Sequence, residues 1–296
     1  FWMLAVKQSQ KYYARANISD VILVMTIIMA LMLLFIILTS NPFLRYLPLS
    51  PMEGVELNPL LQDPGLILHP PMLYMGYVGF IVTFAFSVVG LWHGRIDKKW
   101  AALMQPWCLL AWSFLTIGIV LGSWWAYREL GWGGWWYWDP VENASLMPWL
   151  TGTALIHSLQ VTTRYERFRA WTSLMSILTF TLSLLGTFLV RSGLLVSVHS
   201  FANDPSRGKL LLFIISLVLG SSLCLYAYRA KNLQDQSPCI LGSTESFLFA
   251  NNLLLVLSAA VVLLATLYPL YSAWVDQEII SIGPSYFQKV FTPIWS

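Results

Sequence analysis

Long apolar runs separated by short polar segments fill most of the chain, and each run has 18 or more residues. A helix of about 20 apolar residues crosses the roughly 30 Å hydrocarbon core of a bilayer. The pattern therefore predicts an all-α fold, a polytopic transmembrane helical bundle of about seven spans. The predicted spans are residues 18–39, 71–92, 103–125, 146–163, 172–190, 210–228 and 247–272.

The fourth run, 146–163, is the least regular of the predicted spans, because it is short and contains Pro148 and Gly152. No change in composition, low-complexity tract or internal repeat separates one part of the chain from another. We therefore expect a single integral membrane domain over residues 1–296.

The positions of lysine and arginine predict the orientation of the spans, since short cytoplasmic loops carry an excess of both. With the N-terminus inside, eleven of the 17 lie in inner segments and six in outer segments. We therefore expect the N-terminus inside and three long loops that face outward. These loops cover residues 40–70, 126–145 and 191–209.

Composition supports a membrane protein and excludes two other classes. The chain is 57% hydrophobic and 10% charged, whereas soluble domains carry about a quarter charged residues. The net charge of +3 is small, and no basic patch of the kind that binds nucleic acid is present. The three cysteines lie far apart without CxxC spacing, which excludes a thiol–disulfide oxidoreductase.

Tryptophan is concentrated in and beside the second outward loop. Seven of the 15 tryptophans lie between residues 124 and 149, whereas an interfacial belt spreads its rings over many helix ends. Paired glycines allow a flat ligand to approach the backbone here, and Asp139, Glu142 and Asn143 add polar groups that could anchor it. We therefore favour a binding platform over a plain belt. Its tryptophans are Trp124, Trp125, Trp132, Trp135, Trp136 and Trp138.

Two histidines flank this platform on the same predicted face. His69 stands before Pro70 and Pro71, just ahead of the second span, and proline suits the first turn of a helix. His199 lies in the third outward loop. Either histidine alone is typical of a solvated loop, but two beside an aromatic platform are what an axially ligated haem iron requires. We therefore predict that both bind the iron of one haem.

A third histidine, His157, falls inside a predicted span and near the middle of the membrane. An ionisable residue at this depth is costly and often marks function. From the residues alone, a ligand of a b-type haem and a core histidine satisfied by polar neighbours fit equally well. His93, at the inner end of the second span, is interpreted as a loop residue.

Two arginines, Arg128 and Arg191, lie next to the outward elements. A guanidinium can bind a carboxylate through two parallel hydrogen bonds, and haem carries two propionates. Ordinary positive flanking of helix ends explains the same positions equally well, so both readings stay open.

Four segments carry a resemblance to known proteins. The run Trp132–Asp139 resembles the WWD signature of the superfamily of haem-handling membrane proteins. The segments Leu60–Gly76 and Arg191–Asp204 resemble those that carry two outer histidines in the CcmF family of cytochrome c haem lyases. Thr151–Ser158 resembles the segment that bears a transmembrane b-haem ligand in that family. The resemblance extends over nearly the whole chain.

This resemblance implies a subunit that positions and reduces haem for thioether attachment to the CxxCH thiols of apocytochrome c. His69 and His199 would hold the incoming haem, and His157 would hold a separate haem b that reduces it. The implied partners are a haem chaperone of the CcmE type, a CcmH-type subunit that presents apocytochrome c, and the lipid membrane. The implied location is the bacterial plasma membrane or the mitochondrial inner membrane.

The chain departs from the family in length, since family members are usually much longer and supply a second b-haem ligand farther along. No histidine follows His199 here. We therefore expect the chain to be part of a longer or split protein, with that ligand supplied from outside these residues, for example by a separate C-terminal CcmF chain.

Three other functions fit part of the sequence pattern. A haem exporter or haem-delivery subunit of the same superfamily would share the platform and the outer histidines, but the extra spans and His157 disfavour it. A b-type electron-transfer subunit would need paired buried histidines. A secondary transporter would show broken helices at matching positions in two halves, and the sequence has no such symmetry.

Overall fold

The computed structural model describes residues 1–9, 18–45, 47–48, 52–54, 59–131, 133–192, 195, 197, 205–233, 242–275 and 280–295. Within these residues the protein is helical and contains no β-strand. The helices are α1 (Trp2–Ser9), α2 (Ile18–Ser40), α3 (Pro64–His93), α4 (Lys98–Glu129), α5 (Pro140–Tyr165), α6 (Arg169–Arg191), α7 (Pro205–Arg229), α8 (Thr244–Val275) and α9 (Pro284–Trp295), with short 3-10 helices at Pro59–Gln62 and Ala230–Leu233.

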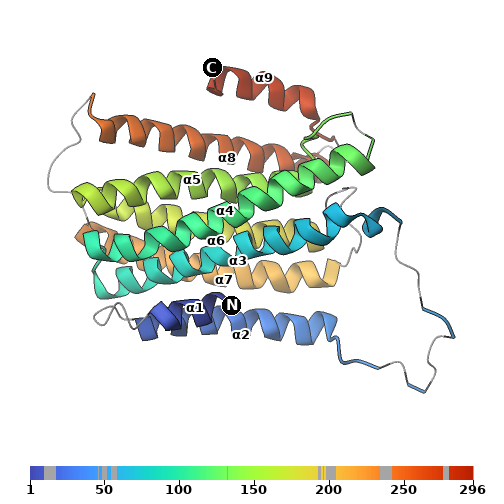
Figure 1. Cartoon of the computed structure of the whole chain (residues 1–296), viewed down its shortest axis with the longest axis horizontal. Helices are drawn as coiled ribbons and strands as arrows, with labels where there is room; N and C mark the ends of the chain where they lie inside the picture. The colour runs from blue at the N-terminus through green and yellow to red at the C-terminus, as the bar shows by residue number, and fades with distance from the viewer. Residues whose placement is uncertain are drawn as a thin grey trace.

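The long helices α2 to α8 lie side by side and alternate in direction along the chain (Figure 1). The starts of α3, α5 and α7 therefore share one end of the bundle with the ends of α4, α6 and α8, on the right in Figure 1. We call this the aromatic end, because the connection between α4 and α5 lies there.

The predicted all-α polytopic bundle is confirmed, and each of the seven predicted spans lies within one of the helices α2 to α8. Six of these helices are long and apolar enough to cross a membrane, namely α2, α3, α4, α6, α7 and α8. The exception is α5, the predicted fourth span, which is 26 residues long but carries many polar side chains. The chain is therefore a multi-pass membrane protein. Contacts with neighbouring helices, rather than its own hydropathy, stabilise α5 within the bundle.

Polar contacts with other helices hold α5 inside the bundle. Asn143 Nδ2 donates to Thr266 Oγ1 of α8 at 3.0 Å, and Asn252 Nδ2 of α8 donates to Ser158 Oγ at 3.0 Å. These four side chains are buried. In a bilayer an unsatisfied polar group costs several kcal/mol, so these bonds explain how a helix of modest hydropathy is stable between α4, α6 and α8.

Glycines bring α3 and α4 unusually close. A Cβ atom at Gly76 of α3 would lie 2.6 Å from the backbone nitrogen of Leu115 in α4. A Cβ at Gly118 of α4 would lie 2.6 Å from the backbone nitrogen of Leu73 in α3. Small residues allow helix backbones to approach in membranes, where van der Waals packing drives association. The two helices therefore pack backbone against backbone.

The start of α3 differs from the predicted one. The helix begins at Pro64 rather than near residue 71, because Asp63 caps it by accepting a hydrogen bond from Gly65 N at 2.6 Å. Asp followed by Pro is a strong start signal. His69, predicted just outside the helix, therefore lies inside α3 together with the two prolines that follow it.

The predicted outward loop 126–145 is also shorter than expected. Helix α4 continues to Glu129 and α5 begins at Pro140, so the connection is residues 130–139. Trp124 and Trp125, predicted as part of the platform, belong to the last two turns of α4. His93, interpreted as a loop residue, ends α3 instead, and its Nε2 lies 2.8 Å from Asp20 Oδ2 of α2.

The close approach of α3 and α4 predicts a strong effect of one methyl group. Gly76→Ala places a Cβ against the Leu115 backbone and should lower the free energy of unfolding by about 1–3 kcal/mol, as overpacking does elsewhere. Gly220→Ala is the matched control, since nothing lies within 4 Å of a Cβ there. Thermal unfolding of both variants in detergent tests this, and equal stability would contradict the backbone contact.

Candidate functional site

His69 faces α4 from the second turn of α3 and packs against the glycines of that helix. Its Nδ1 lies 2.6 Å from the carbonyl oxygen of Gly118. A carbonyl can only accept a hydrogen bond, so Nδ1 carries the proton and donates it. In the neutral ring the lone pair then belongs to Nε2, the nitrogen that can bind a metal. Metal-binding histidines usually donate their other N–H to a carbonyl or carboxylate in this way.

A crevice of about 30 Å³ opens beside His69, with room for one or two water molecules. It is lined by His69 and Leu73 of α3, Ile119, Gly122 and Ser123 of α4, Trp136 of the connection, and Val141, Glu142 and Ser145 of α5. The indole Nε1 of Trp136 is buried and has no hydrogen-bond partner within the described part of the chain. A large planar ligand would therefore lie across the mouth of this crevice rather than inside it.

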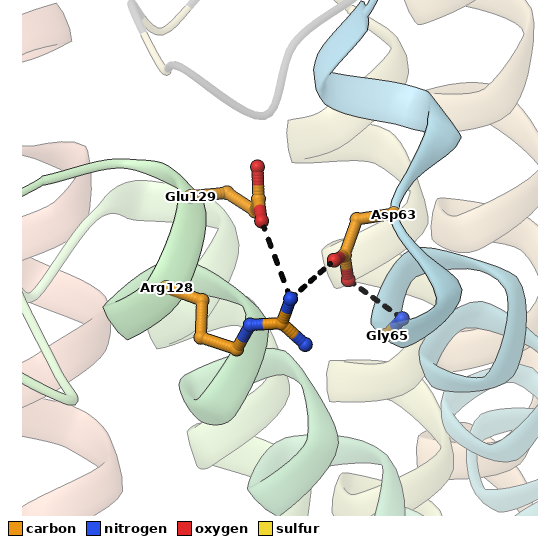
Figure 2. Close-up of polar contacts among 4 residues, drawn as sticks. All are labelled: Asp63, Gly65, Arg128 and Glu129. Carbon is orange, nitrogen blue, oxygen red and sulfur yellow. Dashed lines mark hydrogen bonds and ion pairs between the residues drawn. The ribbon is translucent and has the colours of Figure 1, made fainter.

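An ion pair joins α3 and α4 at the aromatic end (Figure 2). Arg128 Nη2 lies 3.3 Å from Asp63 Oδ2 and 3.9 Å from Glu129 Oε1. The guanidinium carbon is also 4.9 Å from the centroid of the Trp124 ring. The Asp63 side chain is nearly buried, whereas 44% of the Arg128 side chain is exposed. Asp63 thus caps α3 and binds Arg128 at once, and the guanidinium keeps an exposed side.

The predicted tryptophans that the structure describes do not form one continuous platform. Trp125 is completely buried in the bundle. Trp135 is 53% exposed, and its ring stacks on Tyr127 of α4 with centroids 4.9 Å apart and an angle of 10° between the planes. Trp136 lines the crevice beside His69. Among the predicted tryptophans that the structure describes, Trp135 is the most exposed, and its stack with Tyr127 forms an exposed aromatic face.

Trp138 instead binds another part of the chain. Its ring stacks on Phe287 of α9 with centroids 4.3 Å apart and an angle of 3°, and on Phe291 at 5.2 Å and 17°. Both phenylalanines are buried. Trp138 also has a positive φ of 59°, which few residues other than glycine adopt. This tryptophan holds α9 against the connection between α4 and α5.

The polar residues of the tryptophan segment hold that segment in shape. Glu142 Oε2 accepts hydrogen bonds from the backbone nitrogens of Tyr137 at 2.9 Å and Asp139 at 3.0 Å. Asp139 caps α5 through Val141 N, and the two side chains form a capping box. Asn143 Nδ2 donates to the Trp138 carbonyl at 3.1 Å. These bonds fix the connection between α4 and α5, and the role of the three side chains as ligand anchors stays a prediction.

One contact links this segment to the third predicted loop. Ser197 Oγ donates to Asp139 Oδ2 at 2.6 Å. Ser197 stands two residues before His199 in the sequence, but His199 lies outside the described residues. Trp132 lies outside them as well, and so does the side chain of Arg191, the last residue of α6.

His157 lies on α5, and its Nδ1 is 3.4 Å from Asn251 Nδ2 of α8. Glu142 lines the crevice of His69 and stands 157 − 142 = 15 residues earlier on the same helix. At 1.5 Å per residue this is about 22 Å along the axis. The structure therefore does not bring His69 and His157 together, and they cannot bind one iron.

Sequence reasoning missed two residues that contact His69, namely Gly118 and Gly122 of α4. Their GxxxG spacing was a readable signal, because it marks close approach of membrane helices. Asn251 and the pair Phe287 and Phe291 were also missed. These lie far along the chain from His157 and Trp138, and no local pattern links them.

The arrangement suits a metal that arrives within an organic ligand. Within the described part of the chain, no three His, Cys, Asp or Glu side chains converge as they do around zinc or iron held by protein alone. His69 supplies one oriented nitrogen beside aromatic rings and an arginine. Haem requires an axial ligand for its iron, an apolar surface for its ring and a cation for its propionates.

Comparisons with known proteins agree with this chemistry. Residues 1–197 match the family model described as cytochrome C assembly protein. The chain is 56% identical over 293 residues to the cytochrome c-type biogenesis protein CcmF of Pseudomonas aeruginosa, covering 99% of this chain and 45% of that protein. It is 55% identical over 291 residues to CcmF of Escherichia coli, covering 98% of this chain and 45% of that protein.

A solved structure titled cytochrome c heme lyase CcmF superposes with a TM-score of 0.72 at 28% identity, covering 99% of this chain and 43% of that one. The chain thus spans less than half the length of the relatives it matches. A helical multi-pass bundle is the architecture of inner membranes, whereas outer-membrane proteins are β-barrels. By sequence and by fold, this inner-membrane chain belongs to the cytochrome c assembly protein family.

Proposed function

We propose that this chain is the haem-binding part of a cytochrome c haem lyase, with the aromatic end facing outward. The observation that carries the proposal is the hydrogen bond from His69 to the Gly118 carbonyl, beside the crevice lined by Trp136. It gives the imidazole the tautomer and the fixed orientation that an axial ligand of haem iron needs. The 56% identity to a cytochrome c-type biogenesis protein supports the same assignment.

Haem is the substrate in this proposal, and apocytochrome c is the second substrate. Each CxxCH thiol adds across one vinyl group, so the sulfur bonds to carbon and the proton goes to the neighbouring vinyl carbon. The protein contributes chiefly by holding the two partners in reactive geometry, which can supply several kcal/mol of the barrier. His69 and His199 are proposed as the two axial ligands of the iron.

Arg128 is proposed to bind a haem propionate. Its guanidinium contacts Asp63 through one nitrogen and keeps an exposed side. Arginine has five N–H donors, so a propionate can bind in addition to Asp63 and Glu129. Arg191 is proposed for the other propionate because it ends α6 at the same end of the bundle.

The exposed stack of Trp135 on Tyr127 is proposed as the face on which the haem ring or a haem-loaded chaperone rests. Aromatic stacking adds about 0.5–1.5 kcal/mol per pair beyond the apolar area that it buries. Trp136, which lines the crevice, and Trp132 are proposed to contact the same ligand. Trp124, Trp125 and Trp138 are proposed to support this region. Asp139, Glu142 and Asn143 act by keeping the connection in shape.

His157 is proposed to bind a resident haem b that reduces the incoming one. The residues present fit one half of such a site, because His157 is only partly buried and lies against α8. Among the other histidines, His93 is held by Asp20 at the opposite end. The second ligand is proposed to come from a further segment or a separate C-terminal chain. When bound, that haem supplies one electron at a time.

Two further partners complete the proposed reaction. A haem chaperone of the CcmE type would deliver haem to the aromatic end, and a CcmH-type subunit would present reduced apocytochrome c. Both belong on the outer side of the membrane, where the connection between α4 and α5 is proposed to face. These assignments rest on family membership and on the exposed aromatic and cationic groups at that end.

Replacing the proposed axial ligand tests the function directly. In the full-length protein with its partners, His69→Gly should lower haem retention and cytochrome c maturation roughly 10-fold or more, as loss of ligand support does elsewhere. Added imidazole should restore part of both by entering the vacated position. Haem absorbance of the purified protein and stained c-type cytochromes measure this. His93→Gly is the control, and normal maturation in His69→Gly would refute the assignment.

Two tryptophan variants separate ligand contact from support. Trp135→Ala should reduce capture of haem or holo-chaperone and lower thermal stability by less than Trp138→Ala does, because half of this ring is exposed. Trp138→Ala should instead lower stability by about 1–3 kcal/mol through loss of two aromatic stacks. Co-purification and thermal unfolding measure the two effects. Unchanged capture by Trp135→Ala would make that ring part of a membrane-interface belt.

The proposed redox role of His157 predicts a variant that loses haem reduction but keeps haem binding at the aromatic end. His157→Ala in the full-length protein should lose a b-type absorbance and fail to reduce haem at the aromatic end, yet still bind haem there. The reason is the axial distance of about 22 Å between the two positions. Optical spectra before and after addition of reductant measure both sites. An unchanged spectrum together with unchanged maturation would leave His157 a packing residue.

A further inference from the structure

We infer that the Gly118 and Gly122 pair of α4 is a seat for His69, which sets its tautomer and orientation as an iron ligand. The inference rests on the proposed function, since it gives His69 an iron to bind. Both glycines contact the imidazole, and they stand four residues apart, one turn of helix. The spacing that lets two membrane helices approach would thus also serve the ligand of the site.

The Gly118 half of the seat is electronic. Its carbonyl oxygen lies 2.6 Å from His69 Nδ1, so the proton must stay on Nδ1. This leaves the lone pair on Nε2 and makes that nitrogen more basic, because the N–H bond to a carbonyl pushes electron density into the ring. An imidazole without this acceptor could exchange tautomers and present Nε2–H to the iron.

The Gly122 half of the seat is steric. A Cβ at this position would lie 2.5 Å from His69 Cε1, 2.8 Å from Nδ1 and 3.1 Å from Nε2. Contacts under 3.0 Å force something to move, and here the atoms in the way belong to the imidazole itself. Any side chain at 122 would therefore turn the ring and crowd its metal-binding nitrogen. Only glycine leaves His69 in its place.

Four other contacts fix the seat relative to His69. Leu73 rests on Gly118 one turn after His69. The Asp63 and Arg128 pair joins the two helices beyond the seat (Figure 2). On the other side α4 is held to α5 by crossed bonds, from Trp149 Nε1 to Thr116 Oγ1 and from Trp112 Nε1 to Thr153 Oγ1, both at 2.9 Å. The seat therefore cannot drift along α3 or rotate away from it.

A double-mutant cycle tests the inference, with four forms of the full-length protein: wild type, Gly122→Ala, His69→Gly and both changes together. Gly122→Ala should lower the haem retained at the aromatic end roughly 10-fold, the usual cost of a lost supporting contact. If Gly122 acts only through His69, the double variant without added imidazole should match His69→Gly, because the added methyl then meets empty space.

Two glycine variants serve as controls for general packing. Gly220→Ala on α7 has open space for its methyl and should leave haem retention unchanged. Gly76→Ala meets the Leu115 backbone rather than the imidazole, so it should lower thermal stability more than it lowers haem retention. The readouts are the haem absorbance spectrum, the haem-to-protein ratio and the midpoint of thermal unfolding.

Each outcome decides between the readings. If the double variant retains less haem than His69→Gly, or if less of the protein itself accumulates, the methyl disturbs something other than His69. Either result would overturn the inference. Normal haem binding by Gly122→Ala would overturn it as well. If His69→Gly itself retains haem normally, the proposed function fails. If His69→Gly is defective and Gly122→Ala is not, only the seat fails.

Discussion

The contact between α3 and α4 is the constraint on which the rest of the site depends. Four glycine and leucine positions allow the two backbones to touch, and this contact places His69 on the carbonyl of Gly118. With ordinary side chains at the glycines, the helices would stand farther apart and the imidazole would lose its acceptor. A packing feature of the membrane-embedded bundle therefore determines the chemistry available at its end.

Neighbouring residues of the connection between α4 and α5 have different structural roles. Its carboxylates bind backbone nitrogens and fix the turn, while its rings point in different directions. Trp135 lies on the surface, Trp136 lines the crevice and Trp138 is stacked under α9. A single motif thus supplies a scaffold, a contact face and an anchor for a distant helix.

Features that depend on the local sequence pattern could be predicted, whereas contacts between residues far apart in the chain could not. Apolar runs located every long helix, because a span must hide its backbone along its whole length. The start of α3 was misplaced by several residues, although Asp63 followed by Pro64 was a readable signal. The stack of Trp138 on Phe287 could not be predicted, since the two are 287 − 138 = 149 residues apart. His157 was placed by its span, but its neighbour Asn251 came only with the fold.

The polar character of α5 has a consequence for the biogenesis of the protein. Asn143 and Ser158 find their partners, Thr266 and Asn252, on α8. During synthesis α5 leaves the ribosome well before α8 does, so it reaches the translocon with these groups unpaired. A helix of this kind is a poor substrate for insertion by itself. It must wait beside α4 or in the translocon channel until the later helix arrives, which makes insertion of this half of the bundle cooperative.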